Sequence, residues 1–135
     1  SYTRFLVNNS EKMRIKSDGK VAIGNAAPDE MLHVTGNAKA DAFLYNSDKR
    51  LKKEIKPLKN SLNKIQKMSG NSFIWKESNK QDLGLIAQEV EAVYPELVYE
   101  NETTGLKAVD YVRLIPVLLQ AIKELDTEIQ NLKSK

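Results

Sequence analysis

The stretch LIPVLLQAIKELDTEIQNL, residues 114–132, decides the fold at the C-terminal end of this 135-residue chain. Its apolar residues recur at alternating three- and four-residue spacing, which predicts a coiled-coil seam: Ile115, Leu118, Ile122, Leu125, Ile129 and Leu132. We predict one helix over about 111–134, with Asp110 as its N-cap and Pro116 bending or loosening an early turn. Isoleucine alternating with leucine along the seam favours two strands by peptide rules.

The preceding region, residues 47–109, alternates between helical and strand patterns. Apolar spacing predicts a helix with Pro57 in its first turn and Ser69-Gly70-Asn71 at its end. Its apolar face is Ile55, Leu58, Leu62, Ile65 and Met68.

Further along this region, residues 72–76 read as a strand with Phe73 and Trp75 on one face, which we interpret as core. Asp82 is expected to cap a helix over roughly 83–94, which Pro95 ends. Residues 97–99 and 106–109 are predicted strands around a turn.

Residues 1–46 read as β structure. Residues 13–16 alternate apolar and polar side chains, the Asp18-Gly19 pair predicts a hairpin, and residues 21–23 resume the strand. Further short strands are expected at 32–34 and 40–45. Such strands bury little surface in one chain, so winding of three copies would stabilise them. The only histidine, His33, is expected to pack on a strand face, which removes a histidine-based serine triad.

Composition limits the function classes. The absence of cysteine excludes disulfides and thiolate catalysis, and no apolar run is long enough to span a membrane. A hydrophobic content of 41% predicts a modest core, so oligomer burial is expected to supply stability. The start of the chain has no signal-peptide pattern and begins mid-pattern, which suggests a fragment of a longer polypeptide. No glycine loop that could hold phosphates is present, so the sequence does not support a nucleotide that triggers cleavage. We expect no cofactor and no metal.

Charge is unevenly distributed although the net value is only +3. Residues 48–67 are rich in lysine, whereas residues 77–102 are rich in acidic side chains. A basic nucleic-acid adaptor is one interpretation of the first segment, but that segment lacks aromatics. We favour two segments that face each other or face water, and expect no nucleic-acid partner.

The segment Ser47-Asp48-Lys49-Arg50-Leu51-Lys52-Lys53 lies where the composition changes between the two halves. A serine hydroxyl beside a neutral lysine amine is a minimal pair of nucleophile and base. As a bare pattern this pair is common on solvated surfaces, so the neighbouring blocks of sequence decide its meaning.

Four ordered blocks over residues 47–135 are similar to one family. The segment at Ser47 resembles its SD-x-R-L-K signature, and residues 73–75 resemble its aromatic strand. Residues 84–98 resemble its G-IAQEV…yPelV block, and residues 110–125 resemble its C-terminal ending. The family is the endosialidase-type intramolecular chaperones of phage tail fibres and tailspikes, peptidase family S74. Residues 1–46 resemble the shaft segment that often precedes this signature.

The resemblance implies an α+β fold: a β-rich trimeric shaft end over 1–46, then a chaperone autoprotease domain over 47–135 with a trimeric coiled coil. It implies a homotrimer that registers the upstream fibre shaft of the same polypeptide during phage assembly in the host cytoplasm. After self-cleavage, the chaperone fragment is expected to be released or weakly retained. The alternative is a structural trimerisation tip that never cuts.

The site residues also follow from the resemblance: Ser47 as nucleophile and Lys52 as base, with Arg50, Leu51 and Lys53 completing the motif. It implies scission of the Ser47–Asp48 bond. Attack by Ser47 on its own carbonyl would require a four-membered ring, so a neighbouring subunit's serine or an activated water is needed. Attack on the Asn46 carbonyl would instead cut before Ser47. Asn46, Arg50 and backbone amides are the candidate oxyanion donors.

The chemistry places one demand on the lysine. At an ordinary pKa of about 10.4, only about one lysine in 2,500 is neutral at pH 7. Burial and neighbouring cations both favour the neutral amine. A lone loop cannot bury a side chain, so we expect the pair to act only after the chains assemble.

Overall fold

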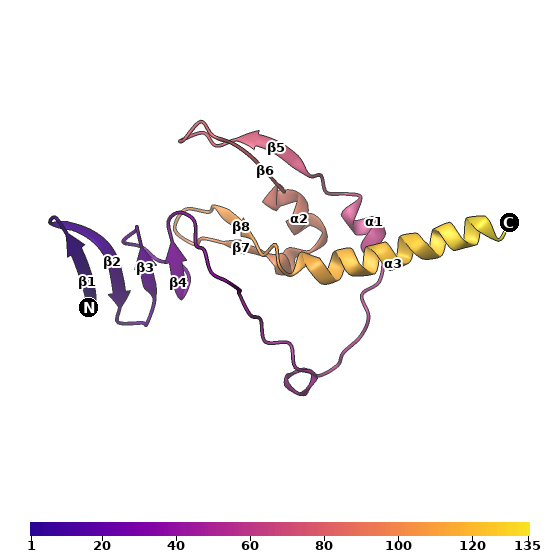
Figure 1. Ribbon diagram of the computed structural model, residues 1–135, viewed down its shortest axis with the longest axis horizontal. Coiled ribbons are helices and arrows are strands. Elements are labelled where there is room, and N and C mark those ends of the chain that lie inside the picture. Colours follow the sequence, from indigo (N-terminus) through magenta and orange to yellow (C-terminus); the bar gives the residue numbers. More distant parts are fainter. The chain divides into compact units, whose positions relative to one another are not determined.

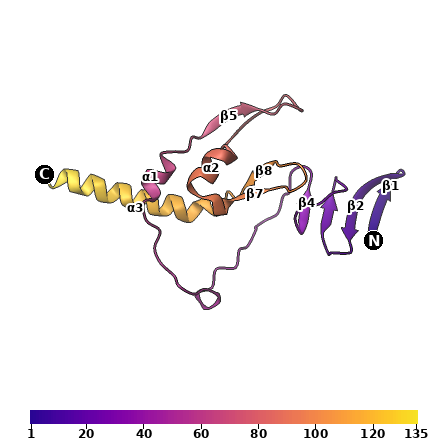
Figure 2. The ribbon, with the colours of Figure 1, turned by 180° about the vertical axis from the view of Figure 1, so that it is seen from behind.

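The computed structural model describes every residue, Ser1–Lys135 (Figures 1 and 2). It confirms a mixed α+β chain with small sheets and a long C-terminal helix. The chain divides into two compact units, Ser1–Leu51 and Lys52–Lys135. None of the helices has the length and apolar character needed to span a lipid bilayer.

The first unit is a four-stranded sheet in sequence order: β1 (Tyr2–Val7), β2 (Ser10–Lys16), β3 (Val21–Ile23) and β4 (Leu32–Val34). β1 and β3 pair antiparallel with β2, and β4 runs parallel to β3. Gly19 has a φ of 88° in the β2–β3 turn, which confirms the hairpin expected at Asp18-Gly19. Ala22 and Pro28 are the buried residues of this unit.

Two predictions for this unit need correction. Residues 1–46 were predicted as β structure, but no strand was named before residue 13. The consecutive Asn8 and Asn9, both with left-handed φ, make the hairpin turn that joins β1 to β2. The strand expected at 40–45 is absent. A strand needs a neighbour to satisfy its backbone, and no segment pairs with these residues; Leu44 is 93% exposed.

The second unit begins with α1 (Ser61–Ile65) and a hairpin of β5 (Asn71–Ile74) and β6 (Gln81–Gly84). α2 (Ala87–Val93) and a 3₁₀ turn (Pro95–Leu97) lead to the antiparallel pair β7 (Val98–Glu100) and β8 (Lys107–Val109). α3 (Leu114–Lys133) ends the chain. The predicted β7–β8 pair and the C-terminal helix are confirmed.

The helix expected to start near Pro57 is shorter than predicted. It covers only Ser61–Ile65, because Asn60 takes a left-handed φ of 57° at its N-cap, and Glu54 has a similar φ of 53°. Residues 52–60 contain no helix or strand. The apolar residues do recur at helical spacing, but the left-handed backbone at Glu54 and Asn60 prevents one continuous helix through them.

The Asp82 prediction is wrong, because Asp82 lies in β6 opposite Phe73 and α2 begins only at Ala87. Its carboxylate accepts a hydrogen bond from Trp75 Nε1 at 2.9 Å. Trp75 packs edge-on against Phe73, with ring centroids 5.0 Å apart, yet it is 53% exposed and so is not core.

The start of α3 also differs from the prediction. The helix N-cap is Arg113, whereas Asp110 accepts the Arg113 backbone N–H at 3.2 Å and so caps the turn before the helix. Pro116 is the third helical residue, where a missing N–H costs little.

The core of the second unit is small and lies where α2, the 3₁₀ turn and α3 meet. Its buried residues are Val90, Tyr94, Leu97, Leu114 and Val117. Most large apolar side chains of the chain remain exposed, as the modest hydrophobic content predicts.

Candidate functional site

The signature segment forms a turn that its own acidic residue stabilises. Residues Lys49–Leu51 make one 3₁₀ turn, and Asp48 Oδ1 accepts the Arg50 backbone N–H at 2.8 Å. Asp48 Oδ2 also accepts a hydrogen bond from the Arg50 guanidinium at 2.7 Å, which raises the pKa of Arg50 above its ordinary value. The Asp-x-Arg part of the signature therefore shapes the backbone between Ser47 and Lys52.

Ser47 immediately precedes this turn and Lys52 immediately follows it. Both lie in an uninterrupted exposed stretch that runs from residue 35 to residue 60. Asn46, Leu51 and Lys53 are exposed in the same stretch. The single chain thus presents the whole motif to solvent.

His33 lies on β4, half-buried, with Nδ1 2.7 Å from Asp29 Oδ1. This carboxylate gives the only imidazole of the chain a local partner.

α3 has two faces of different character. Leu114, Val117 and Ala121 are buried against the second unit. The six predicted seam residues are all exposed, by 41% to 69% of their surface: Ile115, Leu118, Ile122, Leu125, Ile129 and Leu132. Twenty helical residues therefore carry an apolar stripe that nothing in the chain covers.

Two other residues of the matching blocks, Glu89 and Tyr111, bind the backbone just before and just after the β5–β6 hairpin. Glu89 Oε2 on α2 accepts the Ser69 backbone N–H at 2.9 Å. The Tyr111 hydroxyl accepts the Leu85 backbone N–H at 2.8 Å, and a Cβ at Gly84 would lie 2.7 Å from that hydroxyl. Sequence reasoning missed these roles because the partners are 20 and 26 residues apart.

Comparison with known proteins identifies the family to which the segment that begins at Ser47 belongs. Residues 47–99 match the family described as chaperone of endosialidase. This chain carries a domain of the chaperone-of-endosialidase family. The match begins at Ser47 and contains the Asp48–Arg50 turn, Gly84 and Glu89, whereas Tyr111 and α3 lie beyond the matched residues.

Relatives of this chaperone chain are phage fibre proteins. It is 32% identical over 107 residues to the long tail fiber protein Gp37 of Enterobacteria phage K3, and equally to that of Enterobacteria phage T2. These matches cover 73% of this chain but only 9% and 8% of the relatives. The Gp37 protein of Salmonella phage S16 is 32% identical over 100 residues, which cover 67% of this chain and 13% of the relative. The chain spans about a tenth of the length of these relatives.

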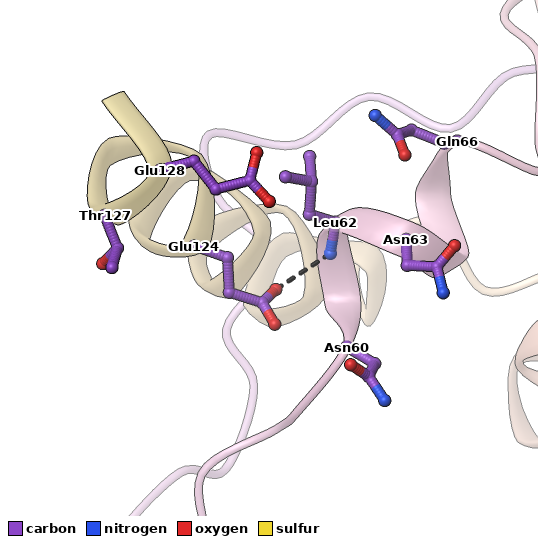
Figure 3. A pocket seen from close by; sticks show the side chains of 7 residues that line it. All are labelled: Asn60, Leu62, Asn63, Gln66, Glu124, Thr127 and Glu128. Atoms are coloured by element: carbon purple, nitrogen blue, oxygen red, sulfur yellow. Dashed lines mark hydrogen bonds between the residues drawn. The ribbon is translucent and has the colours of Figure 1, made fainter. Parts of the chain in front are cut away.

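The second unit also has a polar cleft between α1 and α3, with a volume of about 480 Å³ (Figure 3). Glu124 points from α3 toward the start of α1, where its carboxylate accepts the backbone N–H groups of Ser61 at 3.2 Å and Leu62 at 2.8 Å. The remaining lining residues are polar: Asn60, Asn63, Gln66, Thr127 and Glu128. No sequence signal linked residue 124 to residue 61.

Proposed function

We propose that this chain is the intramolecular chaperone of a phage fibre or tailspike, which trimerises, sets the register of the shaft and then cuts itself from it. Ser47 and Lys52 carry the cut, at the Ser47–Asp48 bond. The observation that carries the proposal is the exposed apolar stripe of α3 in a chain whose signature segment belongs to the chaperone family.

Assembly through α3 supports the chaperone half of the proposal. Three fibre strands with many non-local contacts fold slowly and expose their edges. A C-terminal module that trimerises early raises the effective concentration of the three shaft ends. The shaft in question is the upstream polypeptide that begins with residues 1–46. After the module leaves, unfolding of the shaft becomes kinetically slow because the registering element is gone.

Exposure of Lys52 in the single chain supports an assembly-dependent cut. To accept a proton as a base, the lysine must present a neutral amine. Packing of three copies would desolvate the amine and favour its neutral form. Lys49, Arg50 and Lys53 add cationic neighbours in sequence that act in the same direction.

The cut then proceeds as an ordinary serine acyl transfer. The neutral Lys52 amine takes the proton of the attacking oxygen, which belongs to the Ser47 hydroxyl of a neighbouring copy or to a water. The oxygen bonds to the Ser47 carbonyl carbon, and the C–N bond to Asp48 breaks. Lys52 returns the proton to the departing Asp48 amine, and water hydrolyses any ester formed. Cutting before Ser47 through the Asn46 carbonyl remains the competing route.

The second candidate is a structural trimerisation tip that does not cut. The matching relatives bear the name long tail fiber protein, which fits a segment retained at a fibre end. Both candidates use the same seam and differ only in the chemistry at Ser47.

Denaturing electrophoresis with intact-mass measurement separates the two. Freshly expressed wild type is expected to give two fragments whose masses locate the cut, whereas Ser47→Ala and Lys52→Ala give one chain. Ser78→Ala, at an exposed serine in the turn between β5 and β6, is the matched control and should still cut. A single uncut wild-type trimer would support the structural tip instead.

A further inference from the structure

The start of α1 is held by a residue of α3 rather than by a cap of its own. Asn60 makes no capping hydrogen bond with its side chain, and its left-handed backbone prevents the usual N-cap geometry. Glu124 supplies the missing acceptors through both carboxylate oxygens, to Ser61 and to Leu62; Figure 3 shows the hydrogen bond to Leu62. A helix of five residues is too short to persist without such support.

Glu124 lies on the face of α3 that turns toward its own unit. Val117, Ala121, Glu124 and Glu128 follow one another at three- and four-residue spacing, and the first two are buried. Ile122 and Leu125, the seam residues beside it in sequence, remain exposed. The exposed seam of α3 is therefore available for contact with other copies while Glu124 on the same helix contacts α1.

α1 is the first regular element after Lys52, because residues 52–60 contain no helix or strand. We propose that Glu124 is a positioning residue through which the assembled α3 helices hold the segment that carries Lys52. This inference rests on the proposed self-cleavage. With α1 held, about nine residues separate Lys52 from its fixed point at Ser61; without it, the next regular element is β5 at Asn71, about nineteen residues away.

The length of this tether sets the size of the effect. Effective concentration falls roughly as the −3/2 power of tether length, so doubling the tether lowers docking of Lys52 on the assembled copies by about threefold. Glu124 touches no reacting atom, so its loss changes the rate of cutting and leaves the pH at which cutting begins unchanged.

The test compares Glu124→Ala, Glu124→Gln and Glu128→Ala in the full 135-residue chain. Glu128 lines the same cleft and makes no hydrogen bond to α1, which makes it the matched control. Cleavage half-time is measured at several pH values on trimers isolated by size exclusion, and amide exchange is followed over Ser61–Ile65.

We expect Glu124→Ala to form trimers, to cut at least about threefold more slowly with an unchanged pH midpoint, and to exchange its α1 amides faster. Glu124→Gln keeps one acceptor oxygen and should fall between alanine and wild type, while Glu128→Ala should match wild type. Equal half-times for Glu124→Ala and wild type, equal slowing in Glu128→Ala, or loss of trimers at wild-type concentrations would each overturn the inference. An uncut wild type would refute the proposed cleavage, and unchanged amide exchange would then refute the α1 contact separately.

Discussion

Replacing Ile122 by alanine tests whether the exposed stripe of α3 is an interface between copies. Ile122 is 65% exposed in the single chain, so most of its apolar surface is available for burial by another copy. The substitution removes three carbon groups at about 0.8 kcal/mol each when fully buried. Scaled by the exposed fraction, the loss is about 1.5 kcal/mol per copy, or roughly 5 kcal/mol for a trimer. That loss lowers the trimer association constant by about three orders of magnitude.

Sedimentation velocity across a dilution series measures this association constant directly. Lys123→Ala is the neighbouring control, since this exposed residue lies off the seam, and it should leave the dissociation midpoint within a few-fold of wild type. If Ile122→Ala dissociates at the same concentration as Lys123→Ala, the stripe is not the interface. A wild type that is monomeric at all concentrations would refute the reasoning more simply.

Three further predictions concern the second unit. Val90→Ala removes two carbons from a fully buried side chain, so the unit should lose about 2–3 kcal/mol and its Tm, measured by circular dichroism, should fall by roughly 10 °C or more; an unchanged Tm would contradict the assigned core. Gly84→Ala places a Cβ against the Tyr111 hydroxyl and should cost about 1–2 kcal/mol in urea unfolding, and Tyr111→Phe in the same chain should recover part of that loss. The hydrogen bond from Trp75 lowers the pKa of Asp82. The stabilisation from this contact is therefore complete above the ordinary carboxyl pKa and is lost as pH falls through the lowered pKa. Fluorescence of the single tryptophan should change only at acid pH, and Asp82→Asn should abolish that transition.

Local patterns predicted those elements whose partners lie close in sequence. The strands on either side of Asp18-Gly19, and those on either side of residues 101–105, pair with each other, and the residues of the two turns predict both hairpins. The C-terminal helix is long and periodic, so its extent was predicted to within three residues at either end.

Predictions failed where distant contacts override local propensity. The stretch 40–45 has the composition of a strand but pairs with no other segment. Asp82 has the chemistry of a helix cap, but it pairs with Phe73 in a hairpin and accepts a hydrogen bond from Trp75. Periodicity also could not reveal that residue 124 would cap a helix 62 residues upstream. In the signature segment, the roles of Ser47 and Lys52 came from the resemblance. The hydrogen bonds that Arg50 donates to Asp48 give a local reason why an aspartate and an arginine stand two positions apart there.

The central claim is that self-cleavage requires assembly of the trimer. Intact-mass measurement of a chain that cannot assemble tests this claim most directly. Ile122→Asp combined with Leu125→Asp places two charges on the seam and should keep the chain monomeric at every concentration used. The account predicts that this monomer stays uncut under conditions in which the chains of wild-type trimers are cleaved between Ser47 and Asp48. A monomer that cuts itself at the wild-type rate would contradict it.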